Sequence, residues 1–131
     1  MKLAFSKLGD IAEFVNGAAF KPEDWGDVGK KIIRIQNLTD KSKPYNRTNR
    51  QVGAQFQVQF GDLLVSWSAT LGVFEWDDTE VGLLNQHIFR VRPDSSKVEK
   101  RYLRHALELA LLDMRKHLHV GARLKLPSLA R

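Results

Sequence analysis

Two neighbouring stretches decide the fold of this chain: FGDLLVSWSATLGVF at residues 60–74 and LNQHIFRV at residues 84–91. They contain three short runs rich in apolar, β-branched and aromatic residues, at 63–66, 72–76 and 87–91. Gly61-Asp62 is a turn signal directly before the first run, and a turn followed by a short apolar run is typical of a buried strand. The sequence therefore predicts three strands in this part of the chain.

The composition of the 131 residues is that of one soluble globular domain, with 43% hydrophobic and 27% charged residues. No apolar run is long enough to cross a bilayer, and the first six residues lack the apolar core of a signal peptide. Cysteine is absent, which excludes disulfides, a thiol nucleophile and thiolate metal sites. We expect a single domain over residues 1–131, cytoplasmic and without a membrane partner.

Basic residues are concentrated in two segments on either side of an acidic middle. Residues 30–50 hold seven lysines and arginines against one aspartate, and residues 97–125 hold eight against three acids. Residues 51–96 hold two arginines against six acids. Clustered positive charge with polar hydrogen-bonding residues is typical of a nucleic-acid-binding surface. A solvated basic loop without a ligand is the competing interpretation.

Periodicity and turn signals predict the remaining elements. They are a helical turn running into a strand at 7–16, a helical turn after Pro22, a strand at 31–38, a polar loop at 39–53, a strand at 55–60 and a helix at about 97–118. In the strand at 55–60, alternation predicts that Phe56, Val58 and Phe60 face inward. In the helix, apolar residues recur every three or four positions, and a serine just before it can cap its start.

The polar loop carries the chemistry that DNA reading requires. Lysine and arginine contact phosphates, while arginine reads guanine and asparagine or glutamine reads adenine. Arg47, Asn49, Arg50 and Gln51 supply these groups side by side. The candidate DNA contacts are Lys41, Lys43, Tyr45, Arg47, Asn49 and Arg50 in the loop, with Arg34, Gln36 and Asn37 just before it.

Three motifs in a fixed order carry a resemblance to a known family. LGDIAEFVNG at 8–17 is followed by IRIQNL at 33–38 and by GDLLVS at 61–66. A small-residue turn with Gly72 and an Asn-Gln-His strand ending in RVRP at 90–93 come next. This ordered set resembles a target-recognition domain, the DNA-reading domain of the specificity subunit of type I restriction–modification systems.

The resemblance implies an α+β fold in which a curved, mainly antiparallel sheet packs against a carboxyl-terminal helix. It implies sequence-specific recognition of one half of a bipartite double-stranded DNA target, with methylation and cleavage left to partner modification and restriction subunits. No catalytic residue, metal or cofactor is expected. In the family, the turn after the central strand lies near the DNA face, which adds Trp67, Ser68 and Thr70 as candidates. Gln86 lies where the family has a residue that locks the fold or reaches DNA.

The carboxyl end departs from the family pattern. A full specificity subunit has two recognition domains in tandem, separated by long helices that set the spacing of the two half-sites. This sequence has one such domain and a tail at 119–131, in which LPSL echoes the run before a spacer helix. We therefore expect a fragment, a truncated product or a half-subunit, for which self-association is one route to a two-half recognition unit.

Two other classes of function are open. A small metal-dependent nuclease would use Glu75, Asp77, Asp78 and Glu80, but four acids in a hairpin loop without a neighbouring lysine are more typical of a solvated turn. A protein-binding module or decoy would bind a modification subunit and need no DNA. The sequence lacks a Gly-rich phosphate loop, a dinucleotide-binding loop, a methyltransferase Asn-Pro-Pro-Tyr-type motif and a Gly-x-Ser-x-Gly elbow.

Overall fold

The computed structural model describes residues 7–67 and 70–117. The strands are β1 (Ala12–Asn16), β2 (Lys30–Ile33), β3 (Arg47–Thr48), β4 (Gln57–Val58), β5 (Leu63–Ser66), β6 (Gly72–Glu75), β7 (Gly82–Leu84) and β8 (Ile88–Pro93). The helical elements are the 3-10 turns η1 (Pro22–Asp24) and η2 (Ala54–Phe56) and the α-helices α2 (Ile35–Thr39) and α3 (Lys100–His117). The predicted tail at 119–131 lies outside the described residues.

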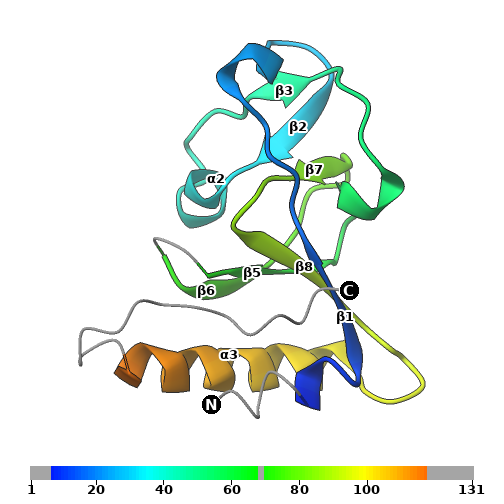
Figure 1. Cartoon of the computed structure of the whole chain (residues 1–131), viewed down its shortest axis with the longest axis vertical. Coiled ribbons are helices and arrows are strands. Elements are labelled where there is room, and N and C mark those ends of the chain that lie inside the picture. Colours follow the sequence, from blue (N-terminus) through cyan, green and yellow to red (C-terminus); the bar gives the residue numbers. More distant parts are fainter. Residues whose placement is uncertain (1–6, 68–69, 118–131) are drawn as a thin grey trace.

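These strands form two four-stranded sheets. The first sheet has the order β1-β8-β5-β6, and all its neighbouring strands are antiparallel. The second sheet has the order β3-β2-β7-β4, and its central pair, β2 and β7, is parallel. Figure 1 shows α3 along one face of the first sheet and the second sheet beyond the other face. The predicted α+β class and the packed helix are confirmed, and the sheet is divided in two.

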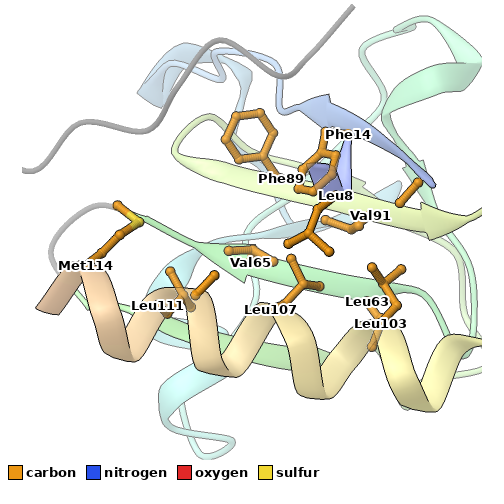
Figure 2. Close-up of a cluster of buried hydrophobic side chains, with 12 residues drawn as sticks. Leu8, Phe14, Leu63, Val65, Phe89, Val91, Leu103, Leu107, Leu111 and Met114 are labelled. Carbon is orange, nitrogen blue, oxygen red and sulfur yellow. The ribbon is translucent and has the colours of Figure 1, made fainter. Parts of the chain in front are cut away.

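Strand β5 is buried on both faces, which explains its unbroken apolar sequence. Leu63 and Val65 pack with Leu107 of α3, as Figure 2 shows, in a cluster that also contains Phe89 of β8. Leu64 belongs instead to the cluster between the two sheets. Because successive side chains of a strand point to opposite faces, one strand contributes to both clusters. The three predicted strands at 63–66, 72–76 and 87–91 are present as β5, β6 and β8, which are neighbours in the first sheet.

Helix α3 packs through the apolar stripe that its sequence predicts. The buried side chains of the stripe are Leu103, Leu107, Ala110, Leu111 and Met114. The helix begins at Lys100, three residues later than predicted, because residues 94–97 form a turn. In that turn, Asp94 Oδ1 accepts hydrogen bonds from the backbone N–H and the hydroxyl of Ser96, at 3.1 and 2.6 Å. The side chain of Ser96 therefore closes this turn with Asp94, instead of capping the start of the helix.

The prediction of one strand over residues 31–38 was wrong in its second half. β2 ends at Ile33, and α2 begins two residues later. The amide of Asn37 explains the change, because its Oδ1 accepts a hydrogen bond from the backbone N–H of Arg34 at 3.1 Å, at the amino end of α2. This side-chain bond stabilises a helical start after an extended residue.

Two further predictions near the second sheet need correction. Only Gln57 and Val58 of the segment 55–60 form a strand, and Phe60 is 64% exposed instead of inward. The segment 82–84, for which no strand was predicted, forms β7 beside β2. Gly82 permits this pairing, since a Cβ there would lie 2.5 Å from Ile33 Cδ1. Long-range pairing of β4 with β7 and of β7 with β2, which local periodicity does not contain, selects these strands.

Candidate nucleic-acid interface

The structure divides the predicted DNA contacts into three groups. The first group lies with α2 on one side of the second sheet and comprises Lys41, Lys43, Tyr45 and Arg47. The second group lies on the other side of this sheet and comprises Asn49 and Arg50. The third group lies at the ends of β5 and β8 and comprises Trp67, Thr70 and Gln86. The alternation of β3 produces the first division, because Arg47 pairs in register with Lys31 while Thr48 faces the opposite side. Ser68 lies outside the described residues.

Two cations of the first group, Lys41 and Arg47, are paired with the acidic segment 75–80, as is the neighbouring Lys31. Lys41 Nζ lies 2.6 Å from Asp77 Oδ2, and Arg47 Nη1 lies 2.7 Å from Glu80 Oε2. Lys31 Nζ lies 2.5 Å from Asp78 Oδ2. The prediction of a merely solvated acidic turn was therefore wrong, because the fold supplies the basic partners from the segment 31–47. Much of the positive charge of that segment is neutralised within the domain.

Two of these pairs, Lys31–Asp78 and Lys41–Asp77, shift the pKa values of both partners in the expected directions. The hydrogen bond from Lys31 holds the pKa of Asp78 below its ordinary value, and the backbone N–H of Glu80 adds to this effect. The hydrogen bond from Lys41 likewise lowers the pKa of Asp77. The pKa of Lys31 is raised, chiefly by its hydrogen bond to Asp78. Each pair therefore stays ionised over a wider pH range than its members would alone.

Acid should destabilise the domain through these carboxylates. A carboxyl whose pKa is lower in the folded chain stabilises the fold above about pH 4 and loses that contribution as the pH falls further. We expect the free energy of unfolding to fall more steeply below about pH 4 in the wild type than in Asp78→Asn, which lacks the titrating group. Urea unfolding at several pH values measures this difference. The exposed Asp27→Asn should follow the wild type, and parallel curves for Asp78→Asn and the wild type would contradict the prediction.

Asn37 was predicted as a DNA contact, and the structure assigns it to the fold instead. Its side chain is 3% exposed. Besides accepting from the backbone of Arg34, its Nδ2 donates to the carbonyl oxygens of Lys43 and Pro44, at 3.4 and 3.1 Å. A buried amide with these partners holds the loop against α2 and has no surface to offer a base. Gln36, one residue earlier, is exposed.

Three of the predicted arginines have partners in the fold. Arg47 Nη1 also donates to Gly29 O at 2.9 Å. Arg50 Nη1 donates to Ala19 O at 2.9 Å and lies 3.2 Å from Asp24 Oδ2. The guanidinium of Arg34 lies 4.8 Å from the ring centroid of Trp25, a cation–π contact. Arg47 and Arg50 therefore fasten the loop to neighbouring segments, and neither is free in the way its sequence position suggested.

A hollow of about 150 Å³ lies beside Asn49 and Arg50 on the second sheet. It is lined by Gly29, Lys30, Thr48, Asn49, Arg50, Gln51, Val52, Gln57 and Leu83. Its lining is polar except for Val52 and the buried Leu83. Four of the lining side chains form no hydrogen bond or ion pair with any other described residue: Lys30, Asn49, Gln51 and Gln57. The hollow therefore presents unoccupied donors and acceptors to a ligand.

The third group surrounds the junction of β5 and β8. The ring of Trp67 is half-buried and meets the ring of His87 edge-on, with centroids 5.3 Å apart. His87 has a φ of 74°, a left-handed conformation that is uncommon outside glycine. Gln86 and Thr70 are exposed beside this junction. Trp67 therefore packs as part of the fold, while Gln86 and Thr70 remain available to a ligand.

A match to a protein-family model identifies the family of this chain. The model for the type I restriction modification DNA specificity domain matches residues 2–129, nearly the whole chain. The chain belongs to this family. The resemblance seen in its sequence motifs is thereby confirmed, and sequence-specific DNA recognition within type I systems is the function of such domains. Specificity domains are recognition components without catalytic activity.

A solved structure shows the same fold. The crystal structure of the HsdS subunit from Thermoanaerobacter tengcongensis matches with a TM-score of 0.59 and 16% sequence identity. The match covers 84% of this specificity domain and 33% of the HsdS chain, so the domain spans about a third of that protein's length. A search of curated proteins finds no match.

Two groups that sequence reasoning left out of the specificity domain's contact list are Lys30 and Gln57. Both line the hollow, together with Gln51. Lys30 faces it because it alternates with Lys31 on β2, and Gln57 faces it because it pairs in register with Leu83. Only the basic cluster around Lys30 was visible in the sequence, since the register is set by pairing with other strands. Within residues 7–67 and 70–117, no cluster of side chains is arranged to hold a metal ion and no helix could span a membrane.

Proposed function

We propose that this specificity domain reads base pairs in one half of a bipartite double-stranded DNA target. The observation that carries the proposal is the polar hollow on the second sheet, where Lys30, Asn49, Gln51 and Gln57 offer free hydrogen-bonding groups. Amides and a cation on the surface of a sheet are the groups that contact base edges and phosphates. Membership of the family supports DNA as the ligand, and the free polar groups of the hollow support this surface as the place of contact.

Phosphate contacts are proposed for the cations that the fold leaves free. In the part of the chain that the structure describes, Lys30 and Lys43 form no ion pair and are both exposed. Lys41 is a third candidate for a phosphate contact, because breaking its ion pair costs little free energy: its side chain is 81% exposed and that of its partner Asp77 is 63% exposed. An exposed ion pair of this kind contributes about 0–1 kcal/mol, which a phosphate contact replaces. The paired, half-buried Lys31 and Arg47 are left to the fold.

Salt-dependent, sequence-selective DNA binding is the expected result of the first test. The purified chain is mixed with duplexes of randomised sequence, and bound DNA is selected and sequenced over a series of salt concentrations. We expect a short motif to be enriched and the affinity to fall steeply with salt, because phosphate contacts release counterions. Lys43→Ala should lower the slope of log affinity against log salt by about 1 and leave the motif unchanged.

Arg101→Ala is the matched control for Lys43→Ala, because Arg101 is exposed on α3, across the first sheet from the second sheet. It should change neither the slope nor the motif. Absence of binding at low salt would contradict DNA reading by this chain. Salt-sensitive binding without an enriched motif would reduce the role of the domain to holding phosphates.

We also propose that the domain docks to modification and restriction subunits, which would perform the chemistry on DNA in the cytoplasm. Support comes from α3, where Tyr102, Leu109 and Leu112 are 63%, 54% and 49% exposed. Their spacings of seven and three residues place them along one side of the helix. A protein-binding module that needs no DNA, or a second copy of the domain, would use the same side. Failure of DNA binding in the first test would favour that second candidate function.

A further inference from the structure

We infer that the hollow on the second sheet reads the adenine edge of an A·T base pair, with Asn49, Gln51 and Gln57 as the reading side chains. This inference rests on the proposed function and adds the identity of one base to it. The three side chains come from the loop after β3 and from β4, and all three line the hollow. They share one functional group, the carboxamide.

The chemistry of the lining favours adenine over the other bases. A carboxamide carries a donor and an acceptor side by side and pairs with N6 and N7 of adenine in the major groove. Cytosine is read by an aspartate or glutamate acceptor, and the lining of the hollow contains no carboxylate. Guanine is read by arginine or lysine, but Arg50 is engaged by Ala19 O and Asp24. We assign Lys30 to an adjacent phosphate, and selection of a G·C pair at this position would instead assign it to guanine.

The size of the hollow matches one base edge. Its volume is about 150 Å³. A hollow of this size is suited to one base edge in the major groove. Val52 and the 2% exposed Leu83 provide an apolar floor against which such an edge would be shielded from water.

The wall that carries Asn49 is held in place before any ligand arrives. Thr48 Oγ1 accepts a hydrogen bond from the backbone N–H of Arg50 at 3.0 Å, which closes the turn around Asn49. Gly29 has a φ of 99°, and a Cβ there would lie 2.1 Å from Thr48 O and 2.7 Å from Asn49 Oδ1. Only glycine therefore lets this segment lie directly under the Asn49 side chain.

The wall that carries Gln57 is also fixed. Gln57 pairs with Leu83 of β7, and its carbonyl oxygen accepts a hydrogen bond from Arg90 Nη1 at 2.9 Å. Arg90 is 2% exposed, so this bond is protected from water. Reading groups on rigid, pre-positioned elements discriminate best, because little ordering is required on binding. Both walls satisfy that condition.

The test compares the motif selected by the wild-type chain with the motifs selected by Asn49→Ala, Gln51→Ala and Gln57→Ala. We expect the wild type to discriminate about tenfold or more between A·T and other pairs at one position, and at least one variant to lose that preference there. The salt slope should not change, because none of the three residues is charged. Gln59→Ala, an exposed glutamine two residues from Gln57, is the matched control and should keep the wild-type motif.

A modified base separates edge reading from indirect effects. Replacing the selected adenine by 7-deazaadenine removes the N7 acceptor and should weaken wild-type binding several-fold, while the variant that lost the preference should be insensitive. Unchanged motifs in all three variants, or relaxation at a G·C pair, would overturn the adenine inference while DNA reading by the domain stands. Absence of any wild-type DNA binding would instead overturn the proposed function itself. Urea unfolding of each variant confirms that the fold is retained.

Discussion

Arg90→Ala is expected to lower the free energy of unfolding by about 3–5 kcal/mol, the largest effect among the substitutions considered. The side chain of Arg90 leaves β8 on the face toward the second sheet and is 2% exposed. Its Nη1 donates to the carbonyl oxygens of Gln55 and Gln57, the latter at 2.9 Å. Its Nη2 lies 3.0 Å from Glu13 Oε1. One guanidinium therefore joins β8, β1 and the segment that leads into β4.

The magnitude follows from the groups that the substitution leaves behind. The carbonyl oxygens of Gln55 and Gln57 would lose the donor that Arg90 supplies. Among the described side-chain donors, Gln57 O would keep only Arg92 Nη2, at 3.5 Å. A buried acceptor left without a partner costs about 1–3 kcal/mol. The truncated side chain would also leave a cavity between the sheets. Glu13 contributes little to this cost, because its side chain is 60% exposed and water can replace the ion pair.

Urea unfolding followed by circular dichroism measures the Arg90 effect. Arg101→Ala removes an exposed arginine and should change the free energy of unfolding by about 0.5 kcal/mol or less. Arg90→Lys should fall between the two, because a single ammonium group cannot reproduce the geometry of the guanidinium. Equal stability of Arg90→Ala and Arg101→Ala would show that the two sheets are held together without this residue.

Leu107→Ala is expected to lower the free energy of unfolding by about 2–5 kcal/mol. Leu107 is fully buried in the cluster between α3 and the first sheet, where it packs with Leu63 and Val65. Figure 2 shows its side chain directed from the helix toward β5. Truncation removes apolar contacts and leaves a cavity that the surrounding strands fill only in part.

Leu109→Ala is the matched control for Leu107→Ala, since it makes the same chemical change two residues along the same helix. Leu109 is 54% exposed, so its truncation should change the free energy of unfolding by about 0.5 kcal/mol or less. Similar effects of the two substitutions would mean that α3 does not pack on the sheet through the face described. A large effect at Leu109 alone would indicate that its side of the helix is buried in solution.

Local signals predicted the elements that local physics controls. The run at 63–66 is a strand because it is short, apolar and preceded by a turn, and α3 is a helix because its apolar residues recur with helical spacing. The segment 31–38 was only half predicted, since its helical start depends on the amide of Asn37, which also bonds to Lys43 and Pro44. β7 was missed because only its pairing with β2 and β4 makes it a strand.

The candidate site was predicted in kind and only in part by residue. Asn49 and Arg50 were predicted, and both line the hollow, but Lys30 and Gln57 join them through strand register. Asn37 had the right chemistry for reading a base and is buried in the fold. The role of the remaining candidates stays a prediction for the binding experiments to test.

The strands around β5, the helix α3 and the family follow from turns, periodicity and ordered motifs, which are properties of residues close together in the chain. Which cations are free depends on how the chain folds in three dimensions. Lys41 and Arg47 are paired with acids 36 and 33 residues away, while Lys30 and Lys43 form no ion pair within the described residues. Charge acts through space, so the distribution of positive charge along a chain does not show which of it the fold has already neutralised.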